Sequence, residues 1–350
     1  MSSAGRDGGR AGGLEASAGR STVTVAVDAM GGDRAPGEIV AGALAAAAQL
    51  DVDVLLVGDL DQLAEHLPSA LPSGVELLHA SEVVAMDDDP AAAIRAKKDS
   101  SLVRCAEAVR DGRADAMVGA GNTGATMAAA LLRCGRIPGV ARPAIAVPLP
   151  IPGSTRKQLL VDGGATVDPE PEWLVQWARL GRAYATVRLG VDEPSVGLLS
   201  NGEEPGKGDQ LRKAAFARLG DVAGFIGNVE GRDLMRESAD VIVTDGFTGN
   251  VALKTAEGAL LGIAAMVFGV LDDPEFAGVA EPIKMRLLTA AADLLPDNTG
   301  GALLLGIKGV CIISHGSSSS TAIVNATRVA EQCVRASVVD RLTDALGVQV

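Results

Sequence analysis

The chain has 350 residues, 47% of them hydrophobic and 2% aromatic, and a formal net charge of −13 at pH 7. This length allows one large core or two closely joined ones, and the composition is that of a globular protein rather than a disordered one. The acidic balance and the shortage of rings argue against a general nucleic-acid binder, which needs cations for phosphates and aromatic faces for stacking.

Apolar strand-like runs and helical runs alternate along the chain as far as Leu271. Continuous apolar strands between helices predict an α/β fold, a three-layer αβα arrangement with a mostly parallel sheet. The predicted strands are Val23–Val27, Val52–Val57, Val75–His79, Ala116–Val118, Ala144–Val147, Gln158–Val161, Ser195–Leu199, Gly224–Gly227 and Val241–Thr244. The predicted helices are Glu38–Leu50, Asp61–Leu67, Pro90–Gly112, Ala125–Cys134, Pro171–Gly190, Asp209–Leu219, Gly231–Ser238 and Asn250–Leu271.

The two ends and the region after Leu271 differ from this alternation. Residues 1–21 are rich in Gly, Ser and Arg without an apolar stretch, so we expect a flexible tail and no signal peptide before a single catalytic domain over residues 22–347. The segment Asp272–Pro296 breaks the rhythm, and a protruding helical element is expected around residues 267–296. The longest apolar helical run, Ala259–Leu271, has 13 residues and is too short to span a bilayer.

Glycine-rich polar loops follow several of the predicted strands, and ligands of parallel sheets bind at the carboxyl ends of strands. We therefore expect these loops to lie on one edge of the sheet and to form one site. The first loop, Asp28–Pro36, contains Asp28, Gly31, Gly32 and Asp33 just before a helix. Adjacent glycines let backbone N–H groups approach a ligand, and a helix N-terminus favours anions.

The second loop, Gly119–Gly124, matches G-x-G-x-x-G between a strand and a helix. A dinucleotide site also needs an acidic residue about 20 positions later, for the ribose. No acidic residue occurs from Ala125 to Val161, so the loop predicts anion binding by Asn122, Thr123 and Gly124 rather than NAD binding. A plain tight turn is the simpler alternative.

The same acid-free window carries five cations, which form a basic island in an acidic chain. A solvated surface is the simpler interpretation, and a docking surface for an acidic partner is the alternative. The five residues are Arg133, Arg136, Arg142, Arg156 and Lys157.

The later loops supply the predicted catalytic side chains. Lys207 lies between two glycines in Ser200–Asp209, with Asn201 nearby, and can bind phosphate or stabilise developing charge. Asp245, Thr248 and Asn250 precede or open a helix, where a helix cap is the alternative role. His315, followed by Gly316 and Ser317, is the histidine best placed to contact substrate.

Hydrolase and metal chemistry are less well supported. No G-x-S-x-G elbow is present for a serine nucleophile. No histidine–carboxylate spacing typical of a metal site occurs, and the four cysteines form no C-x-x-C pair. We expect reduced thiols in the cytoplasm, without a metal or a disulfide.

Seven segments in order resemble the PlsX family of acyl-ACP:phosphate acyltransferases. They are VAVDAMGGDRAP, IRAKKDSS, GAGNTGA, GLLSNGEEPGKGD, FIGNVEGRDL, VTDGFTGNVALKTAEG and SHGSS. Two positions differ: Thr166 stands where the family usually has Asn, and Ser200-Asn201 stands where Asn followed by an apolar residue is commoner.

The resemblance implies a fold like the isocitrate/isopropylmalate dehydrogenase and phosphotransacetylase group. It implies transfer of a fatty acyl group from acyl-ACP to inorganic phosphate, without a cofactor, in bacterial phospholipid synthesis. It also implies a homodimer at the inner face of the cell membrane, next to a membrane glycerol-phosphate acyltransferase, with Val267–Leu288 as the membrane-associating element. Packing of Val267–Leu288 in a dimer interface is the alternative.

In this chemistry phosphate attacks the thioester directly, so the protein has to bind a dianion, aim it and stabilise the oxyanion. Backbone amides at Gly31–Gly32, Asn122–Gly124 and His315–Ser317 suit the first task, and Lys207 and His315 the others. Three alternatives remain: an NAD-dependent decarboxylating hydroxyacid dehydrogenase of the related fold, a phosphotransacetylase using acyl-CoA, and a non-enzymatic scaffold at the membrane surface.

Overall fold

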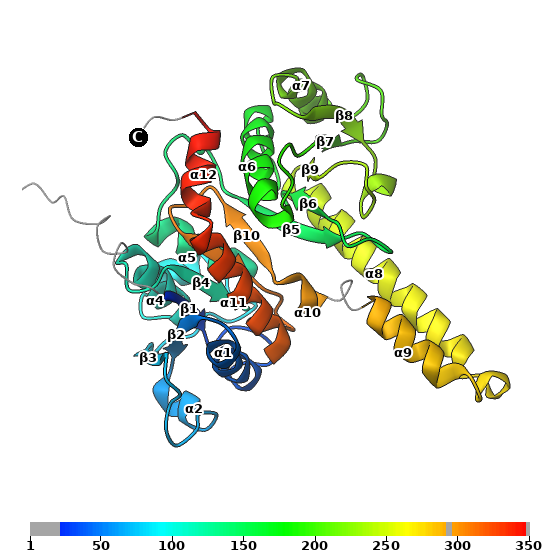
Figure 1. Cartoon of the computed structure of the whole chain (residues 1–350). Coiled ribbons are helices and arrows are strands. Elements are labelled where there is room, and N and C mark those ends of the chain that lie inside the picture. Colours follow the sequence, from blue (N-terminus) through cyan, green and yellow to red (C-terminus); the bar gives the residue numbers. More distant parts are fainter. Residues whose placement is uncertain (1–21, 292–295, 348–350) are drawn as a thin grey trace, which may run out of the picture.

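The computed structural model describes residues 22–291 and 296–347, so the predicted tail over residues 1–21 lies outside the described residues. The described part folds around an 11-stranded sheet with helices on both faces (Figure 1). Its strand order is β3-β2-β1-β4-β11-β10-β5-β6-β9-β7-β8. The strands are β1 (Val23–Asp28), β2 (Val52–Gly58), β3 (Val75–His79), β4 (Ala116–Gly119), β5 (Ala144–Pro150), β6 (Lys157–Val161), β7 (Val196–Leu199), β8 (Phe225–Val229), β9 (Val241–Val243), β10 (Ala302–Leu305) and β11 (Val310–Ile313).

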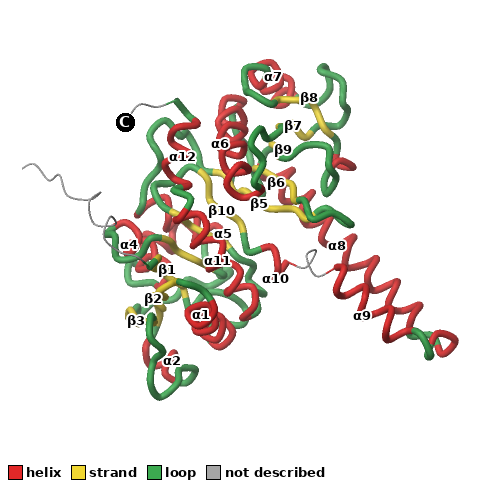
Figure 2. Tube along the Cα trace, viewed as in Figure 1, coloured by secondary structure: helices red, strands yellow, loops and turns green. Residues whose placement is uncertain are grey.

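The helices connect these strands (Figure 2). They are α1 (Gly37–Gln49), α2 (Leu60–Ala64), α3 (Pro90–Ala96), α4 (Ser101–Arg110), α5 (Thr123–Arg133), α6 (Pro171–Leu189), α7 (Gln210–Leu219), α8 (Gly246–Leu271), α9 (Ala280–Ala291), α10 (Pro296–Thr299), α11 (Ser320–Arg335) and α12 (Val338–Ala345).

Alternation along each strand builds the two buried faces. Val25 and Val27 of β1 pack into one core with α1, α6 and α11, whereas Ala26 packs into another with α4 and α5. Successive side chains of a strand point to opposite faces, so a fully apolar strand needs a helix layer on both sides. The predicted α/β class, with three layers and a mostly parallel sheet, is confirmed.

The direction of the strands changes in the middle of the sheet. β1 to β4 and β11 are parallel, but β10 pairs antiparallel with both β11 and β5, and β5 pairs antiparallel with β6. Strands β7, β8 and β9 then follow the direction of β6. The carboxyl ends of β6, β7 and β9 therefore lie on the edge opposite to those of β1, β4 and β11. The prediction that all glycine-rich loops share one edge is wrong.

Other predicted elements differ in extent. The predicted helix Pro90–Gly112 is two helices, because Lys97 leaves helical geometry and Glu82 forms a β-bridge with Ser100 between α3 and α4. The predicted helix Gly231–Ser238 is only a short 3₁₀ turn, Gly231–Asp233. No strand or helix is predicted beyond Pro296, where the described residues form α10, β10, β11, α11 and α12.

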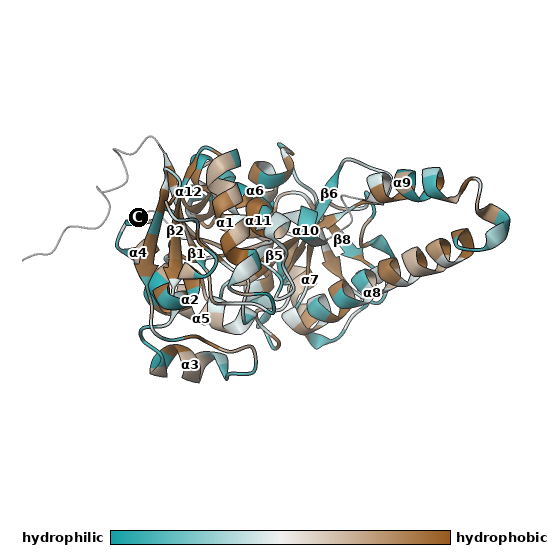
Figure 3. Ribbon diagram, turned by 90° about the horizontal axis from the view of Figure 1, so that it is seen from below, coloured by the Kyte–Doolittle hydropathy of each residue, from teal (hydrophilic) through white to brown (hydrophobic). Residues whose placement is uncertain are grey.

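Helices α8 and α9 form a hairpin that projects from the body (Figure 3). α8 has 26 residues and an 18-residue window with a mean hydropathy of 1.6, so by length and composition it is long enough to cross a membrane. The helix predicted at Asn250–Leu271 begins four residues earlier, at Gly246. The expectation that this region is too short to span a bilayer was based on the apolar run Ala259–Leu271 alone, which is only the second half of the helix. Most large apolar side chains exposed on the described residues lie on this hairpin.

Candidate active site

The predicted site residues fall into two groups, one at each edge of the sheet. The glycine-loop cluster comprises Asp28–Asp33, Ala120–Gly124 and Ser314–Ser318, which follow the adjacent strands β1, β4 and β11. The Arg212 cluster comprises Arg212, Asp162–Thr166, Ser200–Asp209 and Asp245–Asn250, at the ends of β6, β7 and β9.

Backbone contacts hold the glycine-loop cluster together. The Asp33 amide donates to the Gly316 carbonyl at 2.7 Å, and the Ser314 amide donates to the Gly119 carbonyl at 2.8 Å. Gly32 has φ +114°, and a Cβ there would lie 3.0 Å from the carbonyl oxygens of Ala120 and Gly316. A residue with a side chain would meet both strain and a clash, so glycine at this position lets the three loops approach one another.

Three helices begin in or directly after these loops. α5 starts at Thr123, α11 starts at Ser320 and α1 starts at Gly37, after the Asp28–Asp33 loop. The N-terminus of a helix carries partial positive charge and N–H groups without helical partners. Three such ends around one cluster favour an anion there.

Two polar side chains of the cluster are used within the protein. Asp28 is 1% exposed, and burial raises its pKa against the lowering effect of hydrogen bonds from Ser101 and the Met30 and Gly31 amides. The Asn122 side-chain oxygen caps α5 by accepting from the Ala125 amide at 3.0 Å, and its NH₂ donates to the carbonyls of Met86 and Asp88. Both side chains therefore position the loops, and a ligand would meet mainly backbone amides.

His315 is open to the outside. Its side chain is 42% exposed. Ser317 beside it, Thr123 in the loop after β4 and Asp33 in the loop after β1 are exposed as well. His315 Nε2 lies 3.5 Å from Glu257 Oε1 on α8. Burial would raise the pKa of Glu257, but hydrogen bonds from His315 and Lys254 lower it below its ordinary value. Glu257 thus carries a negative charge that fixes and polarises the imidazole.

Arg212 organises the second cluster and was not predicted. Its guanidinium, in a residue 8% exposed, donates to the Leu199 carbonyl, to Asp209, to Asp245 Oδ2 at 2.5 Å and to the hydroxyls of Thr244 and Thr248. Asp245 also caps α8 by accepting from the Thr248 amide at 2.8 Å. Burial opposes ionisation of Asp245, but the Thr248 and Arg212 hydrogen bonds lower its pKa. Both oxygens of Asp245 are thus engaged by the protein, which gives it a structural role.

Asp162 is the second unpredicted residue of the Arg212 cluster. It is 0% exposed, and its carboxyl accepts from the backbone amides of Ile145, Gly164, Ala165 and Thr166 at 2.7–3.1 Å. Burial raises its pKa to about 6, in spite of these hydrogen bonds. A Cβ on Gly249 would lie 1.9 Å from the Asp162 carbonyl oxygen, so the first turn of α8 packs directly on this loop.

The remaining predicted residues lie on the outer loops of this cluster. Asn201 accepts from the Gly208 amide at 2.9 Å, and Asn250 donates to the Gly163 carbonyl at 3.3 Å. Lys207 is exposed, and its aliphatic stem folds over Gly202. Catalysis by Lys207 and Asp245 stays a prediction.

α8 links the two clusters. Its first turn packs on Asp162, and Glu257, 11 residues later, pairs with His315. At 1.5 Å per residue these points are roughly 16 Å apart. One phosphate ion cannot contact both of these points on α8.

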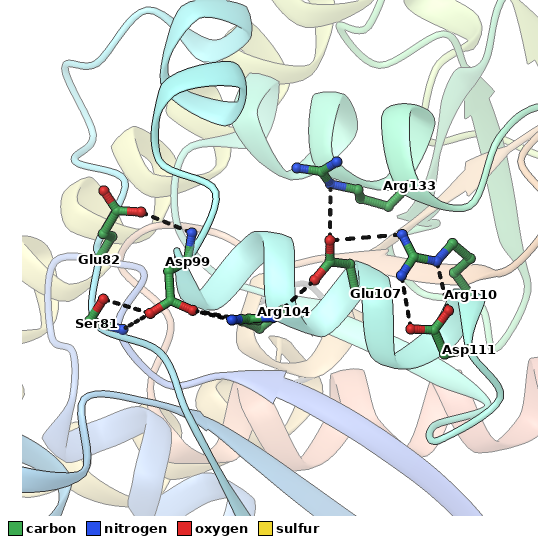
Figure 4. Close-up of polar contacts among 8 residues, drawn as sticks. All are labelled: Ser81, Glu82, Asp99, Arg104, Glu107, Arg110, Asp111 and Arg133. Atoms are coloured by element: carbon green, nitrogen blue, oxygen red, sulfur yellow. Dashed lines mark hydrogen bonds and ion pairs between the residues drawn. The ribbon is translucent and has the colours of Figure 1, made fainter.

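The basic island is not one surface. Arg133 lies 3.6 Å from Glu107, which also pairs with Arg104 and Arg110 (Figure 4). Arg156 pairs with Glu237 and Asp240, and Arg142 stacks on Trp173 with 5.7 Å to the ring centroid. The acidic partners come from distant parts of the chain, which a window of sequence does not reveal. The dispersed pairs support the simpler interpretation over a docking surface.

The described ranges were compared with the side-chain arrangements that metal ions and reactive thiols require. Over residues 22–291 and 296–347, no three His, Cys, Asp or Glu side chains converge as a metal ion requires. The four cysteines are free, and burial raises the pKa values of Cys134 and Cys333 to about 11.

The chain is similar in sequence to a known protein family and to several of its members. Residues 23–341 match the model of a family described as "Fatty acid synthesis protein". The chain is 46% identical over 331 residues to a phosphate acyltransferase of Desulfitobacterium hafniense, covering 92% of this chain and 97% of that one. It is 43% identical over 330 residues to a phosphate acyltransferase of Gloeothece citriformis, with 92% and 93% covered.

Solved structures show the same fold at low identity. A phosphotransacetylase from Streptococcus pyogenes superposes with a TM-score of 0.59 at 15% identity, over 90% of this chain and 94% of that one. A branched-chain phosphotransacylase from Enterococcus faecalis superposes with a TM-score of 0.55 at 14% identity, over 89% and 99%. These likenesses confirm the predicted phosphotransacetylase-type fold.

Proposed function

This chain belongs to the phosphate acyltransferase family, and we propose that its donor is a fatty acyl thioester of acyl carrier protein. We further propose that the reaction serves phospholipid synthesis. The activity itself, transfer of an acyl group to phosphate, comes from the family match and from relatives 43–46% identical over nearly the whole chain. These relatives give no support to the dehydrogenase or to the non-enzymatic scaffold.

The observation that carries the proposed mechanism is the meeting of three helix N-termini beside an open histidine. Phosphate binds at the glycine-loop cluster, on the backbone amides of Gly31–Gly32, Asn122–Gly124 and His315–Ser317. The positive ends of α1, α5 and α11 offset the charge of the dianion. A binding site made of backbone amides needs no resident cation, which fits the acidic composition of the chain.

The reaction then needs no nucleophile from the protein. A phosphate oxygen attacks the thioester carbon, and the carbonyl oxygen becomes an oxyanion. The carbon–sulfur bond breaks, and its electron pair leaves with sulfur, which takes a proton to give the free carrier thiol. His315, held by Glu257, donates a hydrogen bond to the oxyanion or the proton to sulfur.

A trapping experiment tests this function. The protein is incubated with palmitoyl-ACP and phosphate, and hydroxylamine then traps the acyl phosphate as a hydroxamate. The yield with phosphate should exceed the yield without phosphate, because hydroxylamine also reacts slowly with the thioester itself. A folded sample that gives no phosphate-dependent hydroxamate contradicts the proposal. Palmitoyl-CoA in place of palmitoyl-ACP separates the phosphotransacetylase alternative, because that enzyme uses the CoA thioester with equal or higher kcat/KM.

The α8–α9 hairpin supports the proposed homodimer and the contact with the inner membrane surface, where a membrane glycerol-phosphate acyltransferase would take up the product. Leu261 and Met266 are 64% and 65% exposed, and Arg286 is exposed on the neighbouring helix α9, where Lys284 pairs with Asp272 and Glu281. An apolar strip next to a cation suits an anionic lipid surface. Flotation with anionic vesicles and sedimentation of the Leu261→Ser, Met266→Ser variant distinguish the two contacts: loss of flotation in an unchanged dimer indicates membrane binding, and dissociation to monomers indicates a dimer interface.

A further inference from the structure

A small apolar cavity of about 50 Å³ lies beside His315, between the end of β5 and the middle turns of α8. His315, Glu257 and Thr299 supply its polar groups. The rest of the lining is apolar: Val147, Pro148, Leu149 and Pro150 from β5, Leu253, Ala256 and Leu260 from α8, and Met235. His315, a candidate catalytic group, therefore borders a mostly apolar cavity directly.

We propose that this cavity receives the first carbons of the donor's acyl chain, and that the side chains of α8 which line it determine acyl-chain specificity. The proposal rests on the acyl transfer described above and adds where the acyl chain lies. The thioester carbonyl would lie at His315, with the chain running between β5 and α8.

The size of the cavity limits how much of the chain it encloses. A water molecule needs about 10–15 Å³ of cavity space, so a cavity of about 50 Å³ encloses only a few methylene groups. The remaining carbons would continue along α8 beyond Leu260, where Leu261, Ile263 and Met266 are 55–65% exposed. Each methylene group that leaves water on this path adds a favourable hydrophobic contribution, which favours a long chain over a short one.

The negative charge of Glu257 at the mouth of the cavity favours the acyl chain there and disfavours phosphate. Glu257 carries a negative charge and faces His315 from the cavity side, so it repels a phosphate dianion there. On the other side of His315, the backbone of Gly316 joins the glycine-loop cluster with its three helix N-termini. The acyl chain and the phosphate would thus approach the carbonyl from opposite sides of His315.

A matched pair of variants on α8 tests the proposal. Ala256 is half-buried and lines the cavity, whereas Ala259, three residues later, is exposed and does not. In Ala256→Phe the ring would fill the space meant for the chain. We expect the ratio of kcat/KM for palmitoyl-ACP over butyryl-ACP to fall at least tenfold in Ala256→Phe and to stay within twofold of the native ratio in Ala259→Phe.

Two outcomes would overturn the proposal. One is an unchanged ratio in Ala256→Phe, which includes an equal fall in kcat/KM with both donors, and the other is the same fall of the ratio in Ala259→Phe. If Ala256→Phe does not fold, Leu260→Gln replaces it, since this half-buried residue keeps its size and gains a polar end. Its palmitoyl-to-butyryl ratio should fall at least fivefold, and an unchanged ratio is equally decisive. Failure of the proposed function itself looks different, because the native protein then forms no acyl phosphate from either carrier thioester.

Discussion

The glycine-loop cluster and the Arg212 cluster are built by opposite means. In the first, the loops are joined through backbone amides and carbonyls, glycines allow the close approach, and His315 and Ser317 remain open to solvent. In the second, two buried charged side chains, Arg212 and Asp162, hold the loops together, and each uses its polar atoms on the protein. An open set of backbone donors can receive a ligand, whereas a saturated set of side chains holds structure in place.

The largest expected effect follows from breaking the Arg212 cluster. Arg212→Met leaves the Asp245 carboxylate buried without its cation, and breaking such a buried pair costs about 3–5 kcal/mol of unfolding free energy. Urea unfolding followed by circular dichroism measures this loss. Arg232→Met is the matched control, because the Arg232 side chain is 63% exposed and its pairs with Glu203 and Glu230 contribute little. A loss of stability as small as that of the control would contradict the structural role of Arg212.

In the glycine-loop cluster the expected effect is on turnover instead of stability. His315→Gln removes the proton donor, which should lower kcat by about 10²–10⁴-fold. Stability should change little, because the side chain is 42% exposed. Initial rates of acyl phosphate formation measure the effect, with His79→Gln, at the far end of the sheet on β3, as the control. Native turnover in His315→Gln would remove this cluster from the chemistry.

The pH dependence of stability gives a third comparison, through Asp162. Its pKa in the folded protein is raised from 3.8 to about 6, so the folded state binds the proton more tightly than the unfolded chain does. The resulting stabilisation is fully present below pH 3.8 and is lost as the pH rises through 6. The shift of about two units corresponds to roughly 3 kcal/mol.

This loss is isolated by subtracting the unfolding free energy of Asp162→Asn from that of the native protein at each pH. The difference should fall by roughly 2 kcal/mol between pH 4 and pH 8, since the variant cannot titrate at this position and pH 4 already lies above the unfolded pKa of 3.8. A difference that stays constant over this range would show that the folded and unfolded states bind the Asp162 proton equally.

The smallest expected effect concerns Lys207. It lies on an exposed loop of the Arg212 cluster, whose α8 end is roughly 16 Å from the Glu257–His315 pair. If phosphate binds at the glycine loops, Lys207→Ala should change the KM for phosphate less than about threefold. A rise of tenfold or more would bring the two clusters into one site and break the distinction between them.

The sequence predicted the loops better than their arrangement. The polar loops after β1, β4, β7, β9 and β11 were all recognised, because glycines and carboxylates after an apolar run are a local pattern. Their common edge was wrong, since it depends on strand direction. The signal was present, however: only the six residues 151–156 separate β5 from β6, too few for a parallel crossover.

Arg212, Asp162 and Glu257 were harder to find from the sequence. Arg212 lies in a short helix rich in polar residues, and its partners Thr244, Asp245 and Thr248 are 32 to 36 positions away. Buried charges are identified by contacts between distant segments, which a single sequence without relatives does not display. The basic island was misleading for the same reason, as its acidic partners come from α4 and from the segment before β9.

Helix α8 is held by the body at one end and is free of it at the other. Its 26 residues span about 39 Å, its first turn is clamped between Asp162 and Arg212, and its far half stands free of the body. Glu257 lies a little under halfway along, so when a contact at the tip swings the helix about its clamped end, Glu257 moves by about 0.4 of the tip displacement. We therefore expect a displacement of the tip to change the distance between Glu257 and His315 by less than the tip itself moves.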